Sequence, residues 1–329
     1  MKKFINAVDD VLAESLAGFA AAHADLVRLS LEPNYLCRAE KARNKVAVIS
    51  GGGSGHEPLH GGFVGYGMLD AACPGHVFTS PTPDQMLAAA EAAESGRGVL
   101  FIVKNYAGDI MNFQMAAEML PFDNASVFTS DDVAVENSTF TTGRRGVAGT
   151  VIVEKVVGSL AETGADLAAC KALGDRVNSR AASMGVALSS CTVPAAGRPT
   201  FDLDESELEM GVGIHGEPGR RREPMRPADA IVADLVAAIL EDLKPERGSE
   251  ILLMANGFGA TPLMELYLLY NAAARLLREQ GLVVGRSLVG NYVTSLDMAG
   301  ASITVCLLDD EIRRHWDAPV HTPALRWGR

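Results

Sequence analysis

Short runs of β-branched residues recur along the first half of this chain, and each run ends in a turn of small residues that a helical stretch follows. This alternation of strand, tight turn and helix is typical of βα units, which place their strands side by side in a mainly parallel sheet. Strands are predicted at residues 45–50, 76–80, 98–104 and 125–128. Because parallel strands end at one edge of a sheet, the turns after them are expected to lie together.

The second half of the chain also alternates strands and helices, in an order that favours a mixed sheet. Its predicted elements are the strands 208–214, 250–256 and 302–308 and the helices 227–243 and 262–280. With 329 residues, the chain is long enough for about two domains of ordinary size. Residues 194–199 contain two prolines and a glycine and are a predicted linker. We therefore expect two α/β domains, residues 1–193 with a mainly parallel sheet and residues 194–329 with a mixed sheet.

Composition and charge exclude several classes of function. The net charge of −12 would repel a phosphate backbone, so nucleic acid is not an expected ligand. The five cysteines form no CxxC pair, which indicates a reducing compartment rather than a disulfide framework or a zinc ribbon. No apolar run approaches the ~20 residues that span a bilayer, and acidic residues interrupt the only candidate for a signal peptide. We expect a cytoplasmic protein that does not enter a membrane.

Residues 51–58, GGGSGHEP, follow the first predicted strand and form the first candidate binding loop. Small residues let a backbone approach a ligand closely and offer N–H groups to its oxygens, although a simple tight turn needs glycine as well. A dinucleotide fingerprint would need a small residue where His56 or Pro58 stands, and a Walker A loop would need Gly-Lys-Ser/Thr where Gly55 is followed by His56. The loop therefore matches neither nucleotide-binding motif.

The same loop also contains the letters of a zinc-hydrolase motif, H-E-x-x-H, from His56 to His60. That motif requires both histidines on one face of a continuous helix. Pro58 is tolerated only in the first turn of a helix, which would leave His56 in the loop before it. We therefore expect no metal, and the zinc hydrolase is kept as an alternative for metal analysis to test.

Three further side chains are candidates for chemistry. Lys104 and Asp109 flank a turn after the third predicted strand, at the sheet edge where His56 is also expected. There a carboxylate can act as a general base and a lysine can orient a substrate oxygen, although a surface ion pair with a helix cap at Asp109 is an equal alternative. His215 lies among small residues in MGVGIHGEPG, so its ring is accessible to act as a nucleophile, a metal ligand or a general base.

Five motifs in this order, GGGSGHEPLHGGFVGYG, KNYAGD, MGVGIHGEPG, NGFGATP and SLDMAG, together resemble the K subunit of dihydroxyacetone kinase over essentially the whole chain. The resemblance implies a homodimer of two-domain α/β subunits that binds dihydroxyacetone as a covalent hemiaminal on His215. It assigns catalysis to His215, His56 and Asp109. The implied substrate-binding residues are Gly53, Ser54, Gly55, His56, Lys104, Asp109 and His215.

The resemblance also implies a partner, because no nucleotide-binding motif was found in this sequence. A separate L subunit is expected to carry ADP or ATP with magnesium, and no cofactor is expected on this chain. The phosphoryl donor is either phosphoenolpyruvate, through a phosphocarrier of the phosphotransferase system, or ATP. The sequence leaves three further choices open: dihydroxyacetone or a related ketose such as erythrulose, a kinase subunit or a non-catalytic sensor, and which of His56 and Asp109 moves the proton.

Overall fold

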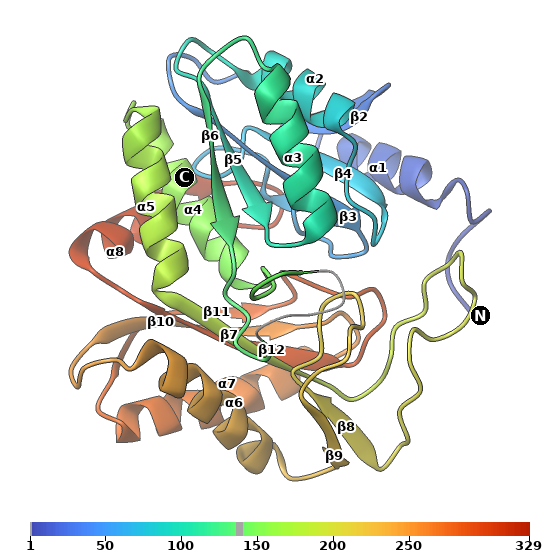
Figure 1. The fold of residues 1–329 in the computed structure, drawn as a ribbon, viewed down its shortest axis with the longest axis vertical. Helices are drawn as coiled ribbons and strands as arrows, with labels where there is room; N and C mark the ends of the chain where they lie inside the picture. The colour runs from blue at the N-terminus through green and yellow to red at the C-terminus, as the bar shows by residue number, and fades with distance from the viewer. Residues whose placement is uncertain (1, 136–140) are drawn as a thin grey trace.

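The computed structural model describes residues 2–135 and 141–329 as an α/β protein with two six-stranded sheets (Figure 1). The first sheet has the strand order β1-β2-β4-β3-β5-β6, and the second has the order β11-β10-β12-β7-β8-β9. Strands β3 to β6 are mutually parallel, whereas the second sheet has one parallel pair, β10 with β11. The predicted fold class, with one mainly parallel and one mixed sheet, is confirmed.

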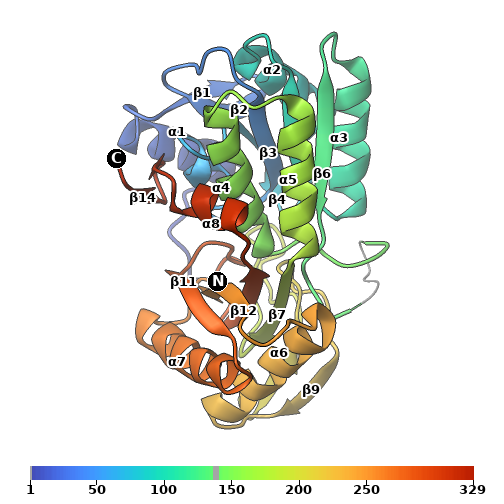
Figure 2. The same ribbon diagram turned by 90° about the vertical axis from the view of Figure 1, so that its left-hand side faces the viewer.

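The first sheet is built from the N-terminal part of the chain. Its strands are β1 (Val27–Leu31), β2 (Asn34–Arg38), β3 (Ala47–Ser54), β4 (Ala71–Val77), β5 (Val99–Lys104) and β6 (Asn124–Thr129). The helices packed around it are α1 (Val11–Ala22), α2 (Pro83–Ala93), α3 (Ala107–Met119), α4 (Gly149–Glu162) and α5 (Leu167–Ser179), with a short 3-10 helix at Gly61–Phe63. Helices α2 and α3 cover one face, and α4 and α5 cover the other (Figure 2).

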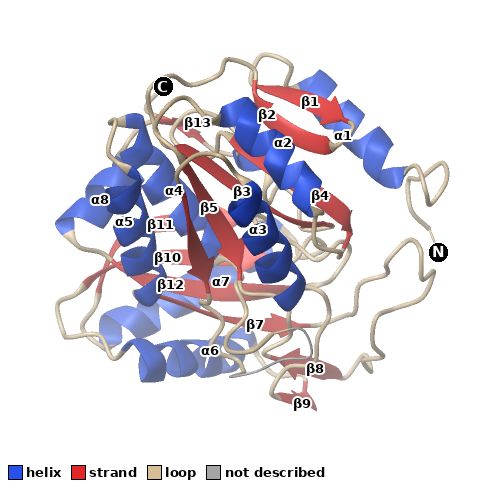
Figure 3. Cartoon of the chain, turned by 45° about the horizontal axis from the view of Figure 1, so that its top comes forward, coloured by secondary structure: helices blue, strands red, loops and turns tan. Residues whose placement is uncertain are grey.

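The second sheet carries the remaining elements. Its strands are β7 (Ala181–Ala187), β8 (Glu207–Met210), β9 (Arg221–Pro224), β10 (Glu250–Gly257), β11 (Val283–Gly290) and β12 (Gly300–Leu307). The helices of this half are α6 (Ala228–Leu243), α7 (Leu263–Glu279) and α8 (Asp310–Asp317), and a final hairpin pairs β13 (Val320–His321) with β14 (Arg326–Trp327). Figure 3 shows α6 and α7 on the side of this sheet that faces away from the first sheet.

A shared hydrophobic core joins the two halves. One cluster contains Ile102 of the first sheet, Val153 of α4 and Met254 of the second sheet, all almost fully buried. Helix α4 lies between the sheets, which explains why nearly every one of its residues is buried. Burying apolar surface from both halves in one core opposes their separation.

The structure places the change from one sheet to the other earlier than the predicted boundary at residues 193 and 194. Strand β7 precedes that boundary, yet it pairs with β12 and β8 in the second sheet. The segment 194–199 is a loop between two strands of the same sheet. Surface loops within a sheet and linkers between domains are both rich in proline and glycine. The composition of residues 194–199 therefore did not distinguish the two.

Two predicted strands are wrong in position. The second strand was predicted at 76–80, but β4 ends at Val77 because its hydrogen bonds with β3 end there. The strand predicted at 208–214 ends at Met210, because Gly211 adopts a φ of 79° that an extended strand does not allow. Residues 211–220 therefore form a loop, and this loop carries His215.

Candidate functional site

The glycine run 51–55 is mainly strand rather than an open loop, since β3 continues to Ser54 in parallel with β4. Its glycines allow neighbouring groups to approach closely. A Cβ on Gly52 would lie 2.2 Å from the Lys104 Nζ, and a Cβ on Gly53 would lie 2.6 Å from the Thr79 nitrogen. The run thus lets a lysine ammonium pass directly beneath the backbone, a role that the count of glycines in the sequence did not reveal.

His56 lies in the turn after β3 and is buried. Its Nδ1 is 2.7 Å from the carbonyl oxygen of Thr294, and a carbonyl only accepts, so Nδ1 carries the hydrogen. The Nε2 of a neutral ring is then an acceptor, and this atom is buried without a hydrogen-bond partner among residues 2–135 and 141–329. Burial, followed by the charges of His215 and Lys104, lowers the pKa of His56 well below its usual value. His56 is therefore a neutral base with a free lone pair.

Lys104, the last residue of β5, and Asp109, in the first turn of α3, form a buried pair. The Lys104 Nζ lies 3.4 Å from the Asp109 Oδ2, and the residues are only 1% and 3% exposed. The alternative of a surface ion pair with a helix cap is wrong on both points, because the pair is buried and the capping position belongs to Tyr106. The other oxygen, Asp109 Oδ1, is buried and has no hydrogen-bond partner in the part of the chain that the structure describes, so it is a second free acceptor.

Lys104 also contacts His60, the last histidine of the H-E-x-x-H motif, and His60 in turn contacts Glu154. The Lys104 Nζ is 3.0 Å from the His60 Nε2, and the His60 Nδ1 is 2.5 Å from the Glu154 Oε1. Burial raises the pKa of Glu154 to about 8. Both ring nitrogens of His60 are occupied, and residues 56–60 form turns rather than a helix. His60 thus supports Lys104 and presents no nitrogen to a metal. In the part of the chain that the structure describes, no other cluster of ligands suits a metal ion.

His215 reaches the same region from the second half of the chain, on the loop after β8. Glu217 holds it twice: the backbone N–H of His215 donates to Oε2 at 2.9 Å, and the ring Nδ1 lies 2.9 Å from Oε1. A carboxylate accepts, so Nδ1 carries the hydrogen and the lone pair is on Nε2. Burial of Glu217 opposes its charge, but the attraction and hydrogen bond of His215, with the charge of Arg145, lower the pKa of Glu217 to about 2. Glu217 is thus an anion at neutral pH.

Aromatic rings bring these groups together. The ring of His215 lies 4.7 Å from that of His56 and 4.7 Å from that of Tyr106, centre to centre, and Phe78 stacks on His56 at 5.0 Å. The structure therefore brings His215 next to residues that are far from it in the sequence. His56 and Tyr106 follow strands β3 and β5, at the sheet edge where the sequence predicted His56 and Asp109. Phe78 and Tyr106 were not predicted site residues, and their only signal was their position beside the predicted turns.

The remaining predicted site residues are Ser54 and Gly55, and both are engaged within the chain. The Ser54 hydroxyl donates to the Gly75 carbonyl at 2.7 Å. The Gly55 N–H donates to the Glu57 carboxylate at 3.0 Å. In this conformation the two residues shape the loop, whereas the free acceptors belong to His56 and Asp109.

A cavity of about 500 Å³ lies beside this cluster, between α1 and the glycine run. Its walls are mainly apolar and include Leu12, Phe19 and Leu296. Gly53, Ser54, Gly55 and His60 line it as well, whereas His56, Lys104, Asp109 and His215 do not. The cavity therefore shares the glycine run and His60 with the polar cluster. No helix among residues 2–135 and 141–329 is long and apolar enough to cross a membrane.

Comparisons with known proteins agree on the family. The Dak1 domain matches residues 17–324. The chain is 48% identical to the PEP-dependent dihydroxyacetone kinase, dihydroxyacetone-binding subunit DhaK, of Escherichia coli, with 100% of both chains covered.

Two solved structures are also similar. One is the dihydroxyacetone kinase of C. freundii, with 35% identity and a TM-score of 0.87 over 98% of this chain and 60% of that one. The other is the dihydroxyacetone kinase operon co-activator DhaQ, with 34% identity and a TM-score of 0.89 over 97% of this chain and 98% of that one. The fold thus occurs both in a kinase and in a regulatory protein.

Proposed function

Because this chain belongs to the Dak1 domain family, which includes the DhaK subunits, we propose that it is the dihydroxyacetone-binding subunit of a dihydroxyacetone kinase. It binds the ketose covalently on His215 and presents a terminal hydroxyl to a nucleotide on a separate L subunit. One observation carries the proposal: the His215 ring, whose Nδ1 is held by a carboxylate, lies 4.7 Å from His56, whose Nε2 is an unpartnered acceptor.

The covalent step follows from the tautomer of His215. The Nε2 lone pair attacks the C2 carbon of the ketose, the π bond of the carbonyl breaks, and its oxygen takes up a proton from water. The ring becomes a cation in the hemiaminal, and the Glu217 carboxylate stabilises that charge through Nδ1–H. Glycerol has no carbonyl for the nucleophile to attack, so the adduct selects a ketose over a triol.

The transfer step uses the free acceptors. As the terminal hydroxyl of the held ketose attacks the phosphoryl group, His56 Nε2 or Asp109 Oδ1 accepts its proton. The Lys104 ammonium, fixed by Asp109 and His60, orients the substrate oxygens. The adduct keeps the attacking oxygen in line with the phosphoryl group, and such positioning supplies much of the catalysis in phosphoryl transfer.

The nucleotide belongs to the partner in this proposal. The glycine run that could have held phosphates is paired in the sheet and packed against Lys104 and Thr79. We propose that the L subunit brings ADP or ATP with magnesium, that a phosphotransferase-system phosphocarrier recharges ADP in the first case, and that this chain forms a homodimer in the cytoplasm.

A second candidate function is a sensor of dihydroxyacetone, which the similarity to the co-activator DhaQ favours. A sensor needs the nucleophile His215 but has no use for a base. The buried acceptors on His56 and Asp109, both left without partners, support the kinase instead.

The test is carbon NMR of the protein with dihydroxyacetone labelled at C2, for wild type and His215→Ala. We expect the ketone signal to be replaced by that of a bound tetrahedral carbon in wild type only. The same spectra with labelled erythrulose determine which ketose is bound more tightly. Addition of the L subunit with its phosphoryl donor then separates the two functions, because a kinase gives dihydroxyacetone phosphate and a sensor gives none. No tetrahedral carbon in wild type overturns the covalent mechanism.

A further inference from the structure

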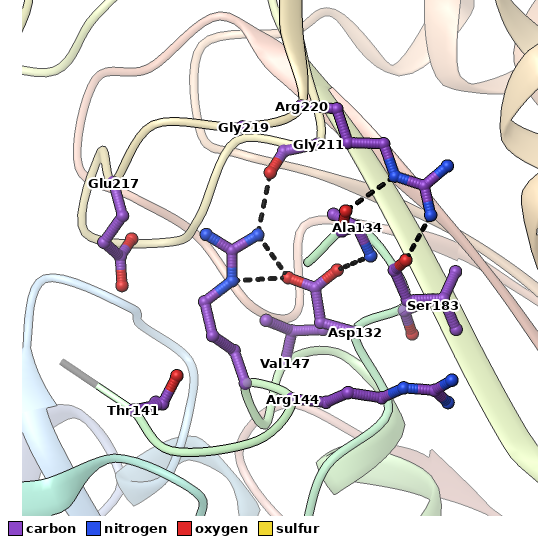
Figure 4. Close-up of polar contacts among 12 residues, drawn as sticks. Asp132, Ala134, Thr141, Arg144, Val147, Ser183, Gly211, Glu217, Gly219 and Arg220 are labelled. Carbon is purple, nitrogen blue, oxygen red and sulfur yellow. Dashed lines mark hydrogen bonds and ion pairs between the residues drawn. The ribbon is translucent and has the colours of Figure 1, made fainter. Parts of the chain in front are cut away.

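Arg145 is a fully buried arginine beside the loop that carries His215, and nothing in the sequence marked it as part of the site. Its Nε and Nη2 both lie 2.7 Å from the Asp132 Oδ2. Its Nη2 also donates to the Gly211 carbonyl oxygen at 2.7 Å, which fixes the start of the loop 211–220. The guanidinium therefore has a rigid place, set by one carboxylate and one backbone oxygen (Figure 4).

The third nitrogen of this guanidinium faces Glu217. Arg145 Nη1 is buried and has no hydrogen-bond partner among the described residues. A Cβ on Gly213 would lie 2.6 Å from that nitrogen and 2.0 Å from the Glu217 Oε2, so the two charged groups flank the same point. Figure 4 shows Glu217 on the opposite side of this region from Asp132, the carboxylate that binds Arg145. Glycine at position 213 is required because any side chain there would fill the space between the two charges.

The charge on Arg145 acts on Glu217 through this gap. Both groups are buried, and the attraction between opposite charges is much stronger in a protein interior than in water. Arg145 is among the causes that lower the pKa of Glu217, after burial and His215. Two further titratable groups lie near Glu217. One is the ring of His56, whose pKa is lowered well below its usual value, first by burial. The other is the Tyr106 hydroxyl, whose pKa is raised well above its usual value by burial and then by Glu217. Tyr106 is therefore neutral, and Arg145 is the cation that faces Glu217 from outside its own loop.

We propose that Arg145, held by Asp132, is a positioning residue for the nucleophile: it keeps Glu217 anionic and in place, so that the His215 hydrogen stays on Nδ1 and the lone pair stays on Nε2. The proposal rests on the proposed role of His215. Arg145 does not touch the substrate in this scheme, and its effect passes through Glu217.

Nitrogen NMR of the histidine rings tests this directly, because it reports which ring nitrogen carries the hydrogen without any ligand. The His215 signal is identified by its absence in His215→Ala. Arg145→Met removes the charge and keeps the length of the side chain, whereas Arg145→Lys keeps the charge. We expect the Met variant to lose the Nδ1–H form and to form the adduct with labelled dihydroxyacetone at least about tenfold less well, as a change of one pKa unit would give. The Lys variant should recover part of both.

Arg38→Met is the matched control, since the Arg38 side chain is only 9% exposed and is paired with carboxylates, Asp70 and Glu162, but lies on β2 away from the site. It should lower stability and leave the His215 tautomer unchanged. The proposal is overturned if Arg145→Met keeps the wild-type tautomer and adduct, or if Arg38→Met changes them equally. Failure of wild type to form an adduct would instead contradict the proposed function, and the ligand-free tautomer would still report on Arg145.

Discussion

His56, from the first half of the molecule, and His215, from the second, lie side by side with their ring centres 4.7 Å apart, yet the two rings are held by different kinds of acceptor. His56 donates its Nδ1–H to a backbone carbonyl, that of Thr294, which carries no charge. His215 donates to the carboxylate of Glu217, whose pKa is lowered to about 2. Both arrangements fix the same tautomer and leave Nε2 free.

The difference lies in what happens when the ring becomes positive. A carboxylate stabilises an imidazolium ion, so His215 can form a bond to carbon and carry the resulting charge. A neutral carbonyl in a buried site stabilises an imidazolium ion much less than a carboxylate does. His56 is therefore suited to accept a proton only briefly. One fold thus gives two chemical roles to identical side chains through the acceptor behind each ring.

Replacing Glu217 by Gln should have the largest effect, because it gives His215 a neutral acceptor like that of His56. The amide can also donate to Nδ1 and so favour the wrong tautomer. We expect turnover with the L subunit to fall by about 10⁴-fold, as for the loss of the carboxylate in a catalytic triad. Steady-state kinetics and the carbon NMR assay measure this. If Glu217→Gln keeps the wild-type turnover, the charge of the acceptor behind His215 does not determine the role of that ring.

Replacing His56 by Asn should separate the two roles. We expect turnover to fall by about 10²- to 10⁴-fold, the usual contribution of a general acid or base. The adduct on His215 should persist, because the Nε2 of His215 is unaffected. Parallel measurement of adduct and turnover checks this, with Asp109→Asn as the second variant. The variant with the larger loss identifies the residue that moves the proton, and loss of the adduct in His56→Asn would refute the separation.

The two histidine environments should also give different pH dependences of stability. The pKa of His56 is lowered by burial, so below its ordinary value of 6.5 the unfolded chain binds protons that the folded chain does not. Stability is therefore lost as the pH falls below 6.5. Glu217 has a lowered pKa, so it stabilises the folded chain fully when the pH is above 4.5, the ordinary pKa of a glutamate. This stabilisation is lost as the pH falls through about 2, the pKa of Glu217 in the folded chain.

Urea unfolding at a series of pH values measures these two ranges. The pKa of His60 is also lowered well below its usual value, with burial as the first cause, so His60 contributes to the same loss of stability below pH 6.5. His56→Asn should reduce the loss of stability just below pH 6.5, and Glu217→Gln should reduce the loss below pH 4.5. An unchanged pH profile in both variants would show that neither environment differs between the folded and unfolded chain.

The smallest effect is expected for Thr294→Val. The acceptor for His56 is the backbone oxygen of residue 294, which the substitution keeps. The hydroxyl contacts with the Glu57 carbonyl, at 2.9 Å, and with the Gly55 carbonyl, at 3.4 Å, are lost, at a cost of about 1 kcal/mol in the free energy of unfolding. Turnover should stay within about twofold of wild type. A large loss of activity would mean that the side chain of Thr294, and not its carbonyl, holds His56.

Much of this protein followed from the sequence. The repeated strand and turn pattern predicted the fold class, the strands β5, β6, β10 and β12, and the helices α6 and α7 within a few residues. The start of α2 shows the same dependence on local sequence, since Thr82 and Pro83 begin the helix and the Thr82 N–H donates to the Gln85 side chain at 2.9 Å. These features depend on local periodicity and on the conformations that proline and glycine allow, and both are visible in a short window of sequence.

The sequence placed His56, Asp109 and Lys104 at one sheet edge, because parallel strands end together. It could not show that Lys104 lies beneath Gly52, that Arg145 faces Glu217, or that the carbonyl of Thr294 fixes the ring of His56. Those contacts join segments that are distant in the chain, and several use backbone atoms that every residue possesses. Residue type and spacing therefore determined which groups could do chemistry, and Glu217, two residues from His215, fixes the free nitrogen of that ring within one loop. For His56 only the packing of the two halves decided it, because the carbonyl that binds its Nδ1 lies 238 residues further along the chain.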